Sequence, residues 1–174
     1  MEHNRTLNHV YLIPVFIFIA LIMDGMIMNI FSAHLISNPY TLTPRLLLLV
    51  LVIFTFFFPK QPLFMYALLF GLIFDSFYSG ILGLYAAGFG TIIYLLKKIH
   101  KFIIPTAVMM IIIYIIALTS LEIFIFLMYL FLGYAEITFQ LFVVTRLGPT
   151  LLLNIILFIM LYYPFYKLSQ WMNS

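Results

Sequence analysis

Long runs of apolar residues alternate along the chain with short breaks that contain proline, glycine or charged residues. The first run is about 20 residues long, which is enough for a helix to cross the roughly 30 Å hydrocarbon core of a bilayer. Breaks fall at turn-forming pairs such as Asn38-Pro39 and Thr43-Pro44, and at the lysine-rich stretch 97–101. The pattern predicts six helices, at residues 10–31, 45–58, 63–77, 81–96, 102–120 or beyond, and 148–168.

The stretch 121–144 fits this pattern least well. It is apolar, but it is interrupted by Glu122, Gly133, Glu136 and Gln140. We favour an extension of the fifth helix followed by an amphipathic segment, while an interfacial helix and a seventh crossing remain alternatives. The helix at 45–58 is short for a complete span, so a tilted or re-entrant geometry is also open there.

Composition decides the solvent of the chain. Hydrophobic residues make up 66% of it and charged residues 7%, whereas soluble globular domains carry roughly a quarter charged residues. Lipid is therefore the expected solvent, and helices satisfy their own backbone groups in lipid. A membrane barrel would show short alternating strands, whereas the apolar runs here are continuous. We expect an all-α polytopic helical membrane bundle of about six transmembrane helices, with residues 1–174 as a single integral membrane domain.

The basic residues predict the orientation. With six helices, one side of the membrane carries Arg5, Lys60, Lys97, Lys98, Lys101 and Lys167, and the other side carries only Arg45 and Arg146. Cytoplasmic loops are enriched in Lys and Arg, so both termini are expected in the cytoplasm. A seventh crossing would move only Lys167. The net charge of +3 is too small to suggest a nucleic-acid partner.

Three acids lie within apolar segments, at Asp24, Asp75 and Glu122. Acids in membrane helices are rare and often functional, here as a proton or cation path or a polar partner site. A buried hydrogen bond or a helix cap is the alternative, which we favour for Asp24 and Glu122. For Asp75 the two interpretations are evenly balanced. Its expected internal partners are Thr150, Asn154 and the free N–H groups that begin the fourth helix, and its external partner would be another protein's membrane segment.

Glycines surround Asp75. Gly71 lies four residues earlier, on the same helix face, where it would let another backbone approach. Gly80 permits the positive φ of a tight turn. Gly83, Ala87 and Thr91 then recur every four residues, which predicts a seam of small residues packed closely against another helix.

The last helix carries a second polar group of residues. Pro149 suits the first helical turn, and Thr150 and Asn154 share one face. We interpret them as interhelical hydrogen-bonding residues in preference to ligand-binding ones. The chain has no cysteine, its four histidines lack the spacing of a metal pair, and no phosphate-binding or dinucleotide motif is present. We therefore expect no cofactor, no metal and no enzyme activity.

Two motifs resemble those of the MreD family, small membrane proteins of the bacterial cell-elongation machinery. The first reads Gly71-Leu72, Asp75, Gly80 and Gly83-Leu84, and the second reads Pro149-Thr150 followed by Asn154. Both occur in the family's order and spacing on a chain of the family's length, so the resemblance covers nearly the whole chain.

The resemblance implies a non-enzymatic scaffold in the bacterial cell membrane that takes part in the regulation of cell shape. Its implied partners are an MreC-like protein with a single membrane span and the peptidoglycan synthases of elongation, with membrane lipid around it. The family is also similar in architecture to the substrate-binding subunits of energy-coupling-factor transporters. That likeness supplies an alternative function, the binding of a small, vitamin-like molecule for a transporter.

Overall fold

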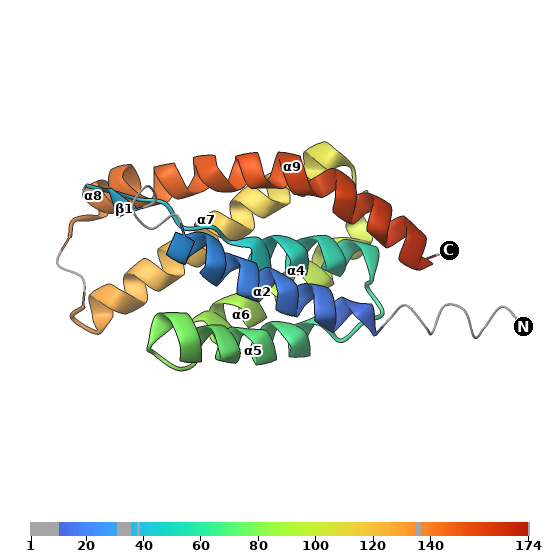
Figure 1. Ribbon diagram of the computed structural model, residues 1–174, viewed down its shortest axis with the longest axis horizontal. Coiled ribbons are helices and arrows are strands. Elements are labelled where there is room, and N and C mark those ends of the chain that lie inside the picture. The colour runs from blue at the N-terminus through green and yellow to red at the C-terminus, as the bar shows by residue number, and fades with distance from the viewer. Residues whose placement is uncertain (1–10, 31–35, 38, 135–136, 174) are drawn as a thin grey trace, which may run out of the picture.

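The computed structural model describes residues 11–30, 36–37, 39–134 and 137–173. Arg5, Asn38, Glu136 and the histidines at 3, 9 and 34 lie outside these ranges. Six main helices run back and forth along an elongated bundle (Figure 1), namely α2 (Leu12–Ile30), α4 (Leu46–Phe57), α5 (Leu63–Phe74), α6 (Leu84–Ile99), α7 (Ala107–Phe131) and α9 (Gly148–Asn173). The expected helical bundle is confirmed. A minor departure from it is an antiparallel pair of two-residue strands, β1 (Ile36–Ser37) and β2 (Tyr40–Thr41).

Helix α4 forms the centre of the bundle. Every residue from Leu46 to Phe56 is buried, and α4 contacts α2, α5, α6, α7 and α9. A helix that is apolar on all sides belongs in an interior. Its 12 residues span only about 18 Å at 1.5 Å per residue, so α4 begins part-way along the bundle.

Helices α5 and α6 pack back to back through glycine. A Cβ atom on Gly71 would lie 2.5 Å from Cα of Ala86, so only glycine allows this approach. The prediction that Gly83, Ala87 and Thr91 form a seam packed against another helix is wrong for the helices of this chain. Gly83 precedes α6 with a φ of 92°, and Ala87 and Thr91 are exposed. The register of α6 is set instead by the contact between Gly71 and Ala86, which turns Ala87 and Thr91 outward.

Several predicted helix boundaries shift because of local backbone chemistry. The third helix continues past Phe74 as a π-helical turn, η2 (Asp75–Ser79), and α6 begins at Leu84 in place of residue 81. Helix α7 begins at Ala107 in place of residue 102, because Thr106 caps it by accepting the N–H of Met109 after the short 3₁₀ turn η3 (His100–Phe102).

The favoured interpretation of residues 121–144 began with an extension of the fifth helix, and this part of it is confirmed. Helix α7 extends through this region to Phe131. The later residues form α8 (Phe139–Phe142) and a second π-helical turn, η4 (Val143–Leu147), which lead directly into α9. Within the described ranges this region forms no separate crossing, because its second half is the beginning of the last helix.

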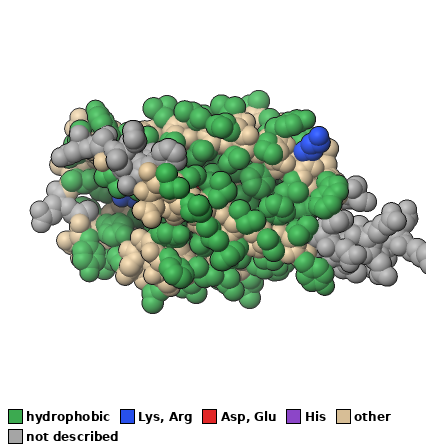
Figure 2. Space-filling view, in the orientation of Figure 1, with side chains coloured by type: hydrophobic (Ala, Val, Ile, Leu, Met, Phe, Trp, Pro, Cys, Tyr) green, Lys and Arg blue, Asp and Glu red, His purple; other side chains and the backbone are tan. Residues whose placement is uncertain are grey.

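Among the residues that the structure describes, length and composition identify three segments that are able to cross a membrane, Leu12–Ile30, Ala107–Phe131 and Phe139–Met172. Apolar side chains cover most of the visible surface (Figure 2). Helix α2 begins and α9 ends at the same end of the bundle (Figure 1). The helix connections place the five lysines toward that end and Arg45 and Arg146 toward the other.

Candidate functional site

The beginning of α4 lies inside the bundle, where its free N–H groups have no water to bind. Asp24, on the neighbouring helix α2, supplies the missing acceptors. Its Oδ1 accepts the N–H of Leu46 at 2.6 Å and its Oδ2 accepts the N–H of Leu47 at 3.0 Å. Asp24 is buried, so it acts as an N-cap provided by a different helix. Its negative charge also suits the positive end of the helix dipole.

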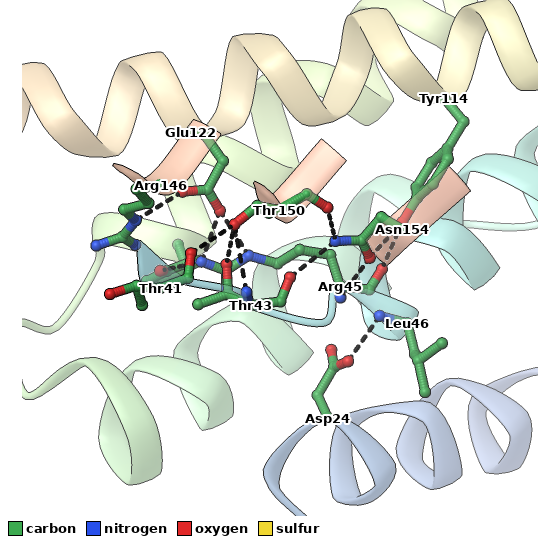
Figure 3. A network of polar contacts seen from close by, with 11 residues as sticks. Asp24, Thr41, Thr43, Arg45, Leu46, Tyr114, Glu122, Arg146, Thr150 and Asn154 are labelled. Atoms are coloured by element: carbon green, nitrogen blue, oxygen red, sulfur yellow. Dashed lines mark hydrogen bonds and ion pairs between the residues drawn. The ribbon is translucent and has the colours of Figure 1, made fainter. Parts of the chain in front are cut away.

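Asn154 of α9 holds the segment that leads into α4 (Figure 3). Its Oδ1 accepts the N–H of Arg45 at 2.8 Å, and its Nδ2 donates to the carbonyl of Thr43 at 2.8 Å. One turn earlier, Thr150 accepts the N–H of Thr43 at 3.2 Å. Tyr114 of α7 donates to Asn154 Oδ1 at 3.1 Å. These contacts satisfy an irregular backbone segment inside an apolar bundle, where unpaired groups would be costly.

Three charged side chains form a buried ion-pair network beside this segment (Figure 3). Arg45 donates from Nε to Glu122 Oε1 at 2.8 Å and from Nη2 to the Tyr85 hydroxyl at 2.8 Å. Arg146 donates from Nε to Glu122 Oε2 at 3.1 Å. Arg45 and Glu122 are 4% and 0% exposed, whereas Arg146 is 30% exposed. Glu122 therefore joins one fully enclosed arginine to one that reaches the surface.

Asp75 caps a second helix in the same manner. Its Oδ2 accepts the N–H groups of Gly83 at 3.0 Å and Ala86 at 3.1 Å, and its Oδ1 accepts that of Tyr85 at 2.9 Å. Its side chain is fully buried. The positive φ values of Gly80 (73°) and Gly83 (92°) turn the chain so that these donors face the carboxylate. Each of these two buried aspartates thus caps a helix other than its own.

A cavity of about 280 Å³ lies next to the ion-pair network. Arg45 and Arg146 form its polar wall, and Tyr78, Tyr85 and Tyr129 line it with aromatic rings. It lies at the end of the bundle opposite the lysines. No three His, Cys, Asp or Glu side chains gather as a metal site in the described part of the chain.

Comparison with known proteins places this architecture in a family. The model of the family described as rod shape-determining protein MreD matches residues 4–172. The chain belongs to the MreD family. It is 29% identical over 155 residues to the rod shape-determining protein MreD of Bacillus subtilis (strain 168), a match that covers 89% of this chain and 90% of that relative. No solved structure matches the chain.

The two motifs that resemble the MreD family lie at the two capped segments. Gly71, Asp75, Gly80 and Gly83 form the junction between α5 and α6. Pro149, Thr150 and Asn154 lie in the first two turns of α9, and Asp24 faces the same α4 entry from α2. Asp75 bonds to the start of α6, whereas Thr150 and Asn154 bond to residues 41–45.

Sequence reasoning missed the two arginines of this MreD-family site. The sequence pattern placed Arg45 and Arg146 in loops on one side of the membrane, and it predicted no role for Tyr85 or Tyr114. The sequence does contain a signal for these arginines, because charged residues inside a membrane usually pair with one another. Acids in apolar segments, with an isolated arginine at the head of one apolar helix, indicate that at least one arginine enters the bundle.

Proposed function

We propose that this MreD-family chain is a non-enzymatic, multi-pass scaffold of the cell-elongation complex in the bacterial cell membrane. It holds the membrane-spanning helix of an MreC-like partner and, through that partner, contacts the peptidoglycan synthases of elongation. Family membership supports the role in cell shape. Both termini are cytoplasmic in this proposal, supported by the five lysines at the end of the bundle where α2 begins and α9 ends.

The observation that supports the partner contact is a groove on the outer face of α5 and α6. Its lining residues are Phe64, Leu68, Ala87, Gly90, Thr91 and Tyr94. Ala87 and Thr91 are exposed, although small residues in membrane helices commonly mark a helix contact. No helix of the described chain covers them. A second helix could approach closely at Ala87, and the Thr91 hydroxyl could bond to its backbone.

The groove can be tested without disturbing the bundle. Ala87→Leu and Thr91→Leu fill it with side chains that project away from the core. Ala107→Leu is the matched control, since Ala107 is also exposed but lies at the start of α7. After co-expression with the MreC-like protein of the same genome, purification in mild detergent should recover at least five-fold less partner with either groove variant. Full recovery of the partner with both groove variants would reject this interface.

A small-molecule binding subunit of a transporter is the second candidate function. The cavity beside Arg146 favours it, because polar groups from several helices converge there. The same purification separates the two functions. Recovery of an ATPase module and a bound vitamin-like molecule, without an MreC-like protein, would favour the transporter function over the scaffold.

A further inference from the structure

Both π-helical turns found in the described residues contribute side chains to the cavity beside the ion-pair network. Tyr78 and Ser79 come from η2, and Arg146 comes from η4. Such turns are rare and occur frequently at functional sites, because they re-aim side chains that a regular helix would direct elsewhere. Because two such turns line one cavity, we infer that the cavity is a specific structural feature. It is separate from the groove on α5 and α6.

Arg146 is the cationic group that this cavity offers to a ligand. A guanidinium has five N–H donors, and only Nε of Arg146 bonds to another described residue. Its two terminal nitrogens point away from Glu122 (Figure 3), and the side chain is 30% exposed. Arg45 differs, because Glu122 and Tyr85 engage its Nε and Nη2 and it is 4% exposed.

The local charges leave Arg146 available for an anion. Arg45 offsets the charge of Glu122 at 2.7 Å. Asp24 also lines the cavity, but both its oxygens accept N–H groups from the start of α4, whose dipole offsets the negative charge. A guanidinium with free terminal nitrogens matches the oxygens of a phosphate, which it binds in a bidentate fashion.

The remaining wall suits a group that is part polar and part apolar. Tyrosines 78, 85 and 129 combine rings with hydroxyls, as side chains at a membrane–water boundary do. Gly25 makes room for one of them, since any Cβ there would overlap the ring and hydroxyl of Tyr78. The volume of about 280 Å³ falls just below the range of pockets that enclose a whole drug-sized ligand, so it fits a head group. In Figure 2, basic side-chain atoms are visible within a hollow at this end.

We propose that this cavity binds a phosphate ester of net negative charge, with Arg146 holding the phosphate oxygens and the tyrosines covering the adjoining carbons. The same chemistry is available from the head group of an anionic phospholipid and from a free sugar or glycerol phosphate. The cavity lies beside the lipid-facing helix α2, which suits the first source, and at one end of the bundle, which suits the second. This site is independent of the partner groove, because α5 and α6 present Ala87 and Thr91 outside it.

Thermal unfolding of the purified full chain in neutral detergent tests the site. The probes are phosphatidylglycerol, phosphatidylcholine as the lipid without net charge, and glycerol 3-phosphate. Phosphatidylglycerol should stabilise the protein at a concentration at least ten-fold lower than phosphatidylcholine does. If glycerol 3-phosphate stabilises the protein as well and competes, the site takes free phosphate esters. If it has no effect, the site takes the lipid head group. An equal response to both lipids, with no effect of glycerol 3-phosphate, would overturn the proposal.

Two variants assign the binding to this cavity. Arg146→Gln removes the guanidinium group and should abolish the preference for phosphatidylglycerol. Because Arg146 also pairs with Glu122, a second variant leaves all charges in place: Met28→Trp fills the cavity from α2. Met26→Trp is its matched control, on the same helix but exposed and outside the cavity. We expect Met28→Trp to lose the preference for phosphatidylglycerol and Met26→Trp to retain it. Retention in both Arg146→Gln and Met28→Trp would overturn the assignment.

Discussion

Replacing Asp75 by asparagine separates a structural role of this acid from a partner-binding one. The carboxylate accepts three backbone N–H groups, two at Oδ2 and one at Oδ1. An asparagine oxygen in place of Oδ2 keeps the bonds to Gly83 and Ala86. Its NH₂ group then faces the N–H of Tyr85, so one bond is lost, and neither of these two donors has an acceptor at this contact. Asparagine therefore replaces this carboxylate only in part.

The magnitude follows from the bond that is lost. A hydrogen bond to a charged group contributes about 1.5–3 kcal/mol to stability, so Asp75→Asn should lower the free energy of unfolding by about 2 kcal/mol. At about 2–4 °C per kcal/mol for a chain of this size, the expected fall in Tm is about 4–8 °C. Asp75→Ala removes all three acceptor contacts and should destabilise at least twice as much.

Thermal unfolding in mild detergent, followed by size-exclusion chromatography of the remaining folded protein, measures this change. Ser76→Ala is the control, since Ser76 is adjacent but exposed and bonds only to the carbonyl of Leu72 among the contacts described. Folded Asp75→Asn protein should retain the proposed MreC-like partner, because the carboxylate is fully buried. An unchanged Tm would refute the capping role. Normal stability with loss of the partner would show that the charge serves the partner.

Three further predictions concern the bundle and its orientation. Glu122→Gln should lower the folded yield severely, because it removes the negative charge that compensates the buried Arg45, at a cost of about 3–5 kcal/mol; a yield equal to that of wild type would contradict the ion-pair account. Gly71→Leu should abolish folded protein on chromatography whereas Ala87→Leu leaves it unchanged, and equal yields would count against the α5–α6 contact. A membrane-impermeant maleimide added to intact cells should label Tyr134→Cys but not Lys98→Cys, and the opposite result would reverse the topology.

The helices were predictable because each depends on local information. Unbroken apolar runs and proline breaks gave the six main helices, and the four-residue spacing of Thr150 and Asn154 correctly placed both on one face. The π-helical turn η2 was not predictable, because the same residues fit a regular helix until Asp75 meets the N–H groups of α6. The inward register of α6 likewise depends on its contact with Gly71.

The sequence identified several polar residues of the site, but it could not show which residues bond to one another. Asp24, Asp75 and Glu122 stand out in apolar sequence, yet Glu122 finds its arginine 77 residues away along the chain. Such a partner depends on how the helices are arranged. The burial of α4 was partly readable, since its run of apolar residues has no polar face and is too short to cross a bilayer.

Site-specific photocrosslinking in living cells tests most directly whether the chain holds a partner helix on α5 and α6. A photoreactive residue at Thr91 lies in the groove. The control position, Ile156, is exposed on α9, a helix that lies across the bundle from α5 (Figure 1). The scaffold account predicts a crosslink from position 91 to the membrane-spanning segment of an MreC-like protein and none from position 156. A crosslink to that protein from position 156 alone would contradict it.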